Sequence, residues 1–352
     1  MGQSTINILA FWPSAPHLSR ALITRRAFFT QTGLLALGAG AAILLRDRVL
    51  WPPPRLIFPD NRQAPPQIAF VSRSHDALAI IAASASGAPV RALIDTGAQI
   101  SVIDRAFVET AGLGRRLGPP MIAYGVGGGA QIAQGVRLDV QLGDLTIRGL
   151  TAAIVDLGPL AAATGLATGL ILGQDVISRL IVDIDFPHRR MALSPPQGFQ
   201  RPSGVIAAPV RRHGRALNAT VVVEGHPVEV TLDTGASGLL SLSVGTARSI
   251  GLFDGRPQRT TASIVLGGMS QSPLLAVSRL DFAGRVWSDV DISLYTPPLA
   301  LGFPNGLLGV EALRDYRAIL DIGAGRLDLL PSTGTKAPHR QRRELDLLVL
   351  PQ

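Results

Sequence analysis

The chain of 352 residues contains the tetrapeptide Asp-Thr-Gly-Ala twice, at Asp95–Ala98 and at Asp233–Ala236. Each copy ends a run of mainly apolar and β-branched residues, and the two aspartates are 138 residues apart. A single Asp-Thr-Gly is an ordinary turn sequence, because Asp and Gly both favour turns. Two copies that end similar runs instead predict that two similar halves each deliver one carboxylate to a common place.

The similarity between the halves extends well beyond the two motifs. At an offset of 138 the chain aligns without a gap up to the second motif: Ile68 with Ile206, His75 with His213, Gly87 with Gly225 and Pro89 with Pro227. Further along, Leu170–Gly173 aligns with Gly306–Gly309 at an offset of 136. A repeat of roughly 125 residues has the size of a domain and is too long for a solenoid unit.

Each copy has the pattern of a β structure. Val221–Val223 and Val228–Leu232 are separated by a turn sequence, which predicts a hairpin. Ala133–Leu142 alternates apolar and polar residues, as a half-buried strand does. Further strands are expected at Leu145–Ile147 and Ala153–Val155, and one short helix per copy at Asp175–Leu180 and Glu311–Tyr316. Asp183 and Asp185 are interpreted as turn or edge charges. The predicted fold class is therefore all-β.

The first 45 residues are interpreted as a targeting segment. Arg25 and Arg26 precede Phe28, and a moderately apolar stretch follows from Gly33 to Leu45, an arrangement typical of a twin-arginine export signal. We therefore expect a bacterial protein that the twin-arginine translocase exports to the periplasm or cell envelope. The alternative is a cytosolic amphipathic helix that contains Arg-Arg. Whether the leader is cleaved is open, so residues 28–45 could also serve as a membrane tether.

The remaining boundaries follow from composition and from the repeat. Residues 46–66 are predicted to be a stiff proline-rich linker, residues 67–197 the first lobe, residues 204–331 the second lobe, and residues 332–352 a polar tail.

Composition argues against several functional classes. The net charge is +8, but it is scattered along the chain without an aromatic-interleaved basic patch, so no nucleic-acid partner is expected. The chain has no cysteine, His-Glu-x-x-His or Gly-x-Ser-x-Gly. We therefore expect neither a zinc peptidase nor a serine hydrolase, and no metal or other cofactor.

Both halves contain the same features in the same order. An apolar strand is followed by Asp-Thr-Gly-Ala and, much later, by two apolar residues and a glycine just before a short helix. This order resembles the retropepsin and pepsin clan of aspartic peptidases, and most of all a single-chain fusion of two retropepsin-type lobes. The resemblance implies two homologous β-barrel lobes with a cleft between them. It also implies catalytic roles for Asp95 and Asp233, supported by Thr96, Gly97, Thr234 and Gly235. Two carboxylates in contact cannot both ionise easily, so they would share one proton.

A glycine-rich segment between the motifs resembles the flap of pepsin-like enzymes. This segment is Ile122–Gly129. The resemblance implies that it forms a hairpin tip that closes over substrate, and that Tyr124, Gly125 and Gly127 contact the substrate there. A plain hairpin tip is the alternative. The corresponding stretch of the second copy, Val265–Met269, lacks the tyrosine. Closure over substrate would then depend mainly on the first lobe.

The function expected from these features is that of an aspartic endopeptidase, which hydrolyses a peptide or protein substrate through a water activated by the paired aspartates. A peptide-binding or regulatory module that has the same fold but no activity is the alternative. A site formed between two chains is also possible, although two near-equal lobes in one chain make it unnecessary.

Overall fold

The computed structural model describes residues 52–62, 64–72, 78–124, 130–158, 168–265, 268–297 and 303–331. For residues 115–124, 130–132, 261–265 and 268–270 the description is limited to the backbone. The chain divides into two units, Met1–Pro52 and Pro53–Gln352, and the structure discussed below lies in the second unit. The predicted leader, tether and C-terminal tail lie outside the described residues.

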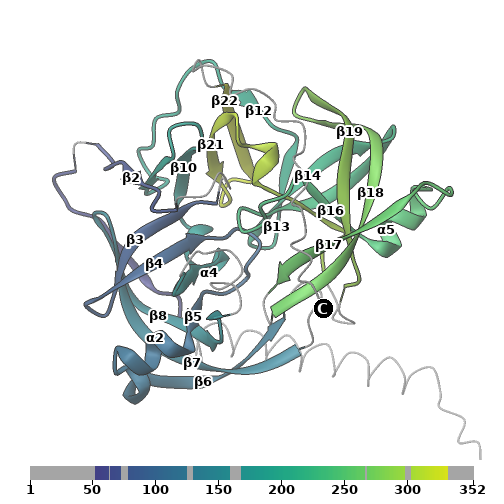
Figure 1. Cartoon of the computed structure of the whole chain (residues 1–352). Helices are drawn as coiled ribbons and strands as arrows, with labels where there is room; N and C mark the ends of the chain where they lie inside the picture. Colours follow the sequence, from purple (N-terminus) through teal and green to yellow (C-terminus); the bar gives the residue numbers. More distant parts are fainter. Residues whose placement is uncertain are drawn as a thin grey trace, which may run out of the picture. The chain divides into compact units, whose positions relative to one another are not determined.

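The first half of this unit folds into a closed β-barrel (Figure 1). Its ring consists of β3 (Ile80–Ala85), β4 (Ala88–Ile94), β9 (Leu170–Leu172), β5 (Val102–Asp104), β8 (Leu145–Val155) and β7 (Ala130–Leu142). The ring closes because β7 pairs with both β8 and β3. Two strands extend the sheet at its edges, β1 (Arg55–Ile57) beside β8 and β6 (Leu117–Tyr124) beside β7.

The second half repeats this barrel strand for strand. Its ring consists of β14 (Ala216–Val223), β15 (His226–Leu232), β20 (Gly306–Leu308), β16 (Leu240–Ser243), β19 (Arg285–Tyr295) and β18 (Gly268–Phe282). The pairing of β14 with β18 closes it, and β13 (Val210–His213) and β17 (Gln258–Val265) extend it. The prediction of an all-β fold with two homologous barrel lobes is confirmed.

Local sequence explains the hairpins that begin each barrel. Ser86 and Gly87 join β3 to β4 with φ values of 49° and 92°, and Glu224 and Gly225 join β14 to β15 with φ values of 48° and 83°. Two consecutive residues with positive φ form the tight turn whose twist matches a hairpin, and glycine adopts such a φ at no steric cost.

A third sheet joins the two halves. Its strands, in spatial order, are β12 (Ile206–Ala207), β22 (Arg326–Pro331), β21 (Tyr316–Asp321), β10 (Ile181–Asp185), β11 (Arg190–Ser194) and β2 (Ile68–Ala69). Strand β10 of the first half pairs antiparallel with β21 of the second. Asp183 lies opposite Ile319, which is its own equivalent at an offset of 136. The approximate twofold relation between the halves therefore passes between these two residues.

The interpretation of Asp183 and Asp185 as turn or edge charges is wrong. Both lie inside β10, and each is only 7% exposed. Arg317 on the neighbouring strand donates to the Asp183 carboxylate from Nε at 2.8 Å and from Nη2 at 2.6 Å. Arg190 and His188 contact Asp185. The buried carboxylates are tolerated because hydrogen-bonded partners, distant in sequence for Asp183 and local for Asp185, compensate for the lost hydration.

The described residues of each half contain more helical segments than the single one predicted. Helices α2 (Arg105–Thr110) and α5 (Val244–Ser249) follow β5 and β16 and were missed, because six residues are too few to show a helical period. The expected later helices are shorter and begin one residue earlier, as α4 (Gln174–Ile177) and the 3₁₀ turn Val310–Ala312. A further 3₁₀ turn, Leu113–Arg116, follows α2.

Part of the predicted linker belongs to the folded domain. Arg55–Ile57 forms β1, which pairs antiparallel with β8. Arg62 adds to this attachment, because its Nη2 donates to Asp144 at 3.1 Å and to the carbonyl oxygen of Leu193 at 2.6 Å. The prolines before β1 indicated a linker, but three residues that complete the edge of a sheet leave almost no pattern in a sequence.

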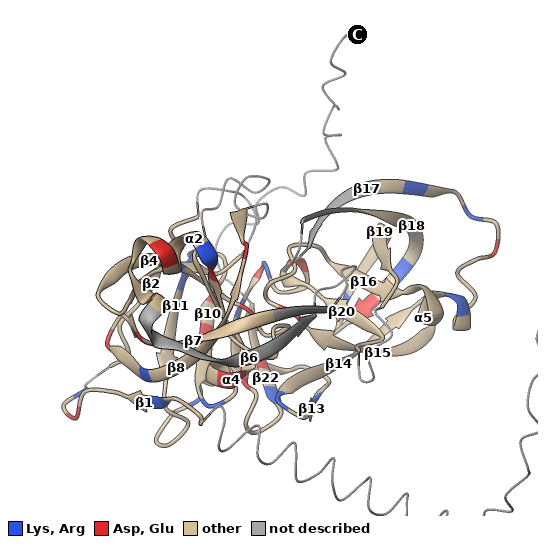
Figure 2. Cartoon of the chain, turned by 90° about the horizontal axis from the view of Figure 1, so that it is seen from below, with Lys and Arg blue, Asp and Glu red and all other residues tan. Residues whose placement is uncertain are grey.

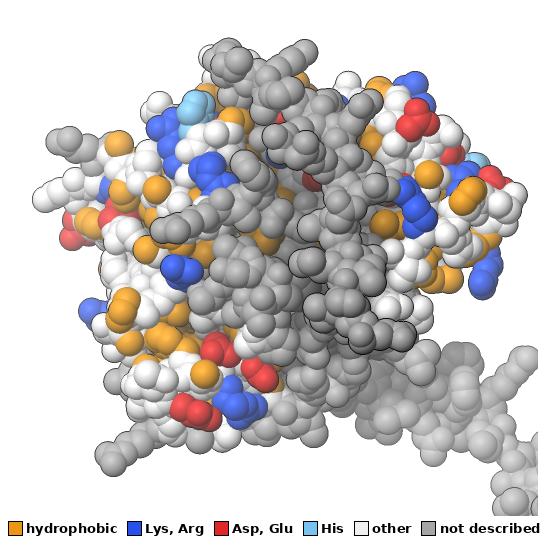
Figure 3. All heavy atoms as spheres, in the orientation of Figure 1, with side chains coloured by type: hydrophobic (Ala, Val, Ile, Leu, Met, Phe, Trp, Pro, Cys, Tyr) orange, Lys and Arg blue, Asp and Glu red, His pale blue; other side chains and the backbone are white. Residues whose placement is uncertain are grey.

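Charged side chains of both signs are interspersed over the described surface (Figures 2 and 3). Many form local pairs, such as Arg279 with Asp281 and Arg285 with Asp315. In the part of the chain that the structure describes, no helix is long and apolar enough to cross a membrane.

Candidate active site

The two Asp-Thr-Gly turns meet where β4 and β15 end. The backbone N–H of Asp95 donates to the carbonyl oxygen of Leu172 at 3.0 Å, and that of Asp233 donates to Leu308 at 2.9 Å. Both acceptors lie on the late apolar strands β9 and β20, which run parallel to β4 and β15. The apolar-apolar-Gly segments therefore lie directly beside the aspartate turns.

The two threonines connect the turns through hydrogen bonds that cross between the halves. Thr96 Oγ1 donates to the carbonyl oxygen of Leu232, and Thr234 Oγ1 donates to that of Ile94, each at 2.7 Å. Each hydroxyl also accepts the backbone N–H of the other threonine at 3.0 Å. Both threonines are completely buried, so these four bonds are shielded from competing water.

The two glycines allow the carboxyl groups to approach. A Cβ atom placed on Gly97 would lie 2.5 Å from Cγ of Asp233, and one on Gly235 would lie 2.5 Å from Cγ of Asp95. No side chain fits at such a distance. Each glycine thus makes room for the aspartate of the opposite half, which explains why both copies need glycine at this position.

The carboxyl groups of Asp95 and Asp233 lie next to each other, each beside the glycine of the opposite turn, and each affects the pKa of the other. Asp95 Oδ1 also accepts the N–H of Gly97 at 2.8 Å and of Ala98 at 3.0 Å, and Asp233 Oδ1 accepts that of Gly235 at 2.8 Å. Removal from water raises the pKa of both groups. For Asp233 the negative charge of Asp95 adds to this effect, so its pKa lies well above the usual range.

The first half contains supporting contacts that the sequence analysis did not identify. Gln174 Nε2 donates to the carbonyl oxygen of Thr96 at 2.7 Å, and both residues are buried. Ser101 Oγ donates to Asp175 at 2.8 Å and accepts the N–H of Gly173 at 3.2 Å. Burial raises the pKa of Asp175. At the offset of 136, Gln174 and Asp175 correspond to Val310 and Glu311, and the strand pairing makes Ser101 correspond to Leu240. Among the described residues these contacts therefore occur in the first half only. Comparison of the two copies would have revealed this difference.

The predicted flap is only partly described. Tyr124 is the last residue of β6 and lies opposite Ala130 of β7, but the structure describes only its backbone. Gly125 and Gly127 lie outside the described residues. The proposed role of this segment in substrate binding therefore stays a prediction. Among the described residues no group of three or more His, Asp or Glu side chains could hold a metal ion.

Comparison with known proteins gives the family. A family model described as aspartyl protease matches residues 81–176 and 219–312, which include both Asp-Thr-Gly-Ala motifs and together make up more than half of the chain. Among solved structures, a retropepsin-like aspartic protease from Rickettsia conorii matches with 16% sequence identity and a TM-score of 0.29, covering 36% of this chain and 89% of that one. No curated protein matches significantly. The chain belongs to the aspartyl protease family.

Proposed function

We propose that the protein is an aspartic endopeptidase in which Asp95 and Asp233 form the catalytic pair. The observation that supports this most is the contact between two carboxyl groups from symmetry-related turns, held by the crossing threonine bonds. Two such groups carry one shared proton over a range of pH, so one can act as a base while the other acts as an acid.

In the proposed reaction the ionised aspartate accepts a proton from a bound water molecule. The water oxygen attacks the carbonyl carbon of the scissile peptide bond, while the protonated aspartate donates its proton to the carbonyl oxygen. The resulting tetrahedral diol then collapses. The aspartate that accepted the water proton passes it to the nitrogen, one hydroxyl of the diol returns a proton to the other aspartate, and the C–N bond breaks, which leaves a carboxylic acid and an amine. The pair titrates as a unit, so neither aspartate is assigned in advance as the acid or the base.

The proposed substrate is an extended stretch of polypeptide. A peptide that lies between two β lobes can hydrogen-bond to strand edges through its backbone, while its side chains enter neighbouring pockets. This mode of binding would present a peptide carbonyl to a pair of aspartates at the ends of β4 and β15.

The test is hydrolysis of a mixed peptide library by the wild type and by the variants Asp95→Asn and Asp233→Asn. Each substitution should abolish turnover while leaving the fold intact, because either change removes the shared proton. Asp60→Asn, at an exposed carboxylate, is the matched control and should retain full activity. Turnover in either dyad variant would contradict the proposal. A wild type that binds peptides but does not cleave them would indicate the alternative, a binding module.

We also propose that residues 1–45 direct export by the twin-arginine route, on the strength of Arg25 and Arg26 before an apolar stretch. Residues 1–60 fused to a reporter that functions only after twin-arginine export should give an active reporter, and replacing both arginines by lysine should abolish the signal. Export of the Lys-Lys variant would show that another route is used.

A further inference from the structure

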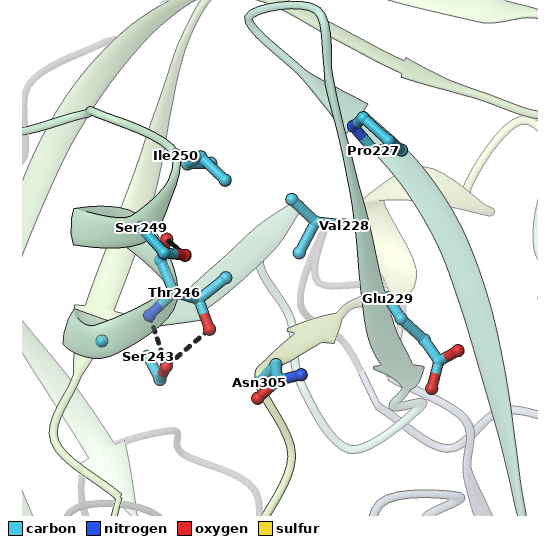
Figure 4. Close-up of a pocket in the computed structure, with 9 residues that line it drawn as sticks. Pro227, Val228, Glu229, Ser243, Thr246, Ser249, Ile250 and Asn305 are labelled. Carbon is cyan, nitrogen blue, oxygen red and sulfur yellow. Dashed lines mark hydrogen bonds between the residues drawn. The ribbon is translucent and has the colours of Figure 1, made fainter.

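A surface hollow of about 410 Å³ lies in the second lobe, between the start of β15 and helix α5 (Figure 4). Its volume falls within the range of ligand-binding pockets. Val228 and Ile250 point toward each other across it, with Thr246 on the same side as Ile250 and Asn305 at one end. The hollow is formed by residues other than those of the aspartate turns.

The repeat shows what occupies the equivalent place in the first lobe. The N–H of Asp104 donates to Gly169, and the N–H of Ser243 donates to Asn305, both at 2.8 Å. These matching bonds make Ser243 the equivalent of Asp104 and Asn305 the equivalent of Gly169. Continuing along helices α2 and α5 from these residues, Thr246 is the equivalent of Phe107.

In the first lobe an aromatic ring takes up this space. A Cβ atom on Gly169 would lie 3.8 Å from Cδ2 of Phe107 and 2.7 Å from Cγ2 of Val90, the equivalent of Val228. Phe107 therefore packs over the glycine beside the valine. In the second lobe Thr246 replaces the ring with a short side chain whose hydroxyl is hydrogen-bonded to Ser243 Oγ at 2.7 Å.

The edge of the hollow is polar. Asn305 is exposed, and its side-chain amide has no hydrogen-bond partner among the residues that the structure describes. Glu229 lies beside it, where hydrogen bonds from Asn218 and then Arg211 hold the pKa of its carboxyl group below the usual range. The lining is therefore mixed: Pro227, Val228 and Ile250 are apolar, and they lie beside the polar residues Glu229, Ser243, Thr246, Ser249 and Asn305. A bound aromatic ring would contact the apolar residues with its faces and meet polar groups at its edge.

We propose that this hollow binds one aromatic side chain, Phe or Tyr, of a partner polypeptide. The ring would lie between Val228 and Ile250, in the place that Phe107 takes in the first lobe. The Asn305 amide would hydrogen-bond to the backbone of the partner. Aromatic anchors of this kind bury a large area with few rotatable bonds and dominate many interfaces. The proposal does not depend on the catalytic role of the aspartates.

The test is a titration of the full chain with the capped peptide Gly-Gly-Phe-Gly-Gly, monitored by NMR at the isoleucine methyl groups. The Ile250 methyl signal should shift and saturate with this peptide and should not respond to capped Gly-Gly-Ala-Gly-Gly. Thr246→Phe supplies the ring of the first lobe and should weaken binding at least tenfold. Thr246→Val changes only the hydroxyl and should leave binding within about twofold.

Thermal unfolding shows whether each variant is folded. Should Thr246→Phe fail to fold, Thr246→Leu fills part of the same space and should weaken binding by a smaller factor. An equal Ile250 response to both peptides, or full binding by a folded Thr246→Phe variant, would overturn the proposal. Toluene that binds as tightly as the Phe peptide would also overturn it, because the polypeptide backbone would then contribute nothing.

Discussion

The two aspartates have the same local sequence but different surroundings. Asp95 Oδ1 accepts the N–H of Ala98 at 3.0 Å, whereas Ala236, the equivalent of Ala98, donates its N–H to the carbonyl oxygen of Asp233 at 3.3 Å. The turn that carries Asp95 is held further by Gln174, for which the second half has an apolar residue. Hydrogen bonds to a carboxylate favour its charged form. The structure thus distinguishes two residues that the repeat makes equivalent.

Replacing Gln174 by Met keeps the volume but removes the donor to the Thr96 carbonyl oxygen. A buried carbonyl left without a partner costs about 1–3 kcal/mol. We expect the free energy of unfolding to fall by about that amount and kcat to fall more than KM rises, because the turn and not the binding surface is affected. Denaturant unfolding and steady-state kinetics measure both. The matched surface control Gln134→Met should change neither, and an unchanged Gln174→Met variant would contradict this role.

A hydroxyl next to each aspartate should change the pH dependence of activity. Ala98 N already donates to Asp95, and a serine at positions 98 and 236 could add a donor to the ionised pair and lower its pKa. We expect wild-type activity to peak in mildly acidic to near-neutral solution, and the basic limb of the pH–rate profile to move toward acid in the double serine variant. Ala207→Ser is the exposed control. A wild-type optimum in strong acid, or a limb that does not move, would refute this.

At the scale of elements, the turns depend on strands that belong to a different part of the same half. The apolar strand β9 is separated from the Asp95 turn by more than seventy residues, yet it passes so close that a Cβ on Gly173 would lie 2.7 Å from the carbonyl oxygen of Ala98. The N–H of Gln174 donates to the same oxygen at 2.8 Å. This close approach explains why the apolar-apolar-Gly segment recurs in both copies.

Gly173→Ala should therefore separate β9 from the turn. The added methyl group would meet backbone atoms that cannot rotate away, and overpacking of this kind costs about 1–3 kcal/mol. We expect a lower melting temperature together with a large loss of activity. Gly114→Ala is the control, because a Cβ there meets nothing within 4 Å. If thermal unfolding of the two variants were the same, the close contact would not matter for stability.

At the scale of the whole domain, the site depends on the joining of two halves. Two sets of contacts between the halves hold the carboxyl groups together. One is the pairing of β10 with β21, and the other is the four hydrogen bonds of Thr96 and Thr234. Burial of the ionised pair lowers the free energy of unfolding, because both carboxyl pKa values are higher in the folded state than in the unfolded chain. The folded protein then binds protons more tightly than the unfolded chain does.

This effect of burial should make stability depend on pH. Because the pKa of Asp233 is raised on folding, its contribution favours the folded state at low pH and is lost as pH rises through the folded pKa. Asp233→Asn removes this effect. We expect the substitution to raise the melting temperature more at pH 7.5 than at pH 4.5, as scanning calorimetry would show. An equal change at both pH values would mean that the pair does not oppose folding when ionised.

The repeat made much of the architecture predictable. Two aligned copies of a strand, an Asp-Thr-Gly turn and a late apolar strand indicated two β-barrel lobes, and the structure brings Asp95 and Asp233 together as that pattern implied. These features can be predicted from the sequence because they are local. They are the alternation of apolar and polar residues, the turn residues, and a motif that must occur twice for two equivalent groups to meet.

Other features were decided only by tertiary structure. The burial of Asp183 depends on Arg317, which is 134 residues away, and β1 exists only because the edge of β8 is free to pair with it. The hydrogen bond from Gln174 to the Thr96 carbonyl oxygen and the hollow beside Thr246 emerge only when the two folded halves are compared contact by contact. Local sequence specifies the hydrogen-bonding groups and the apolar surface of each segment. Which distant segment satisfies them is determined by packing, since that choice depends on the shape of the whole domain.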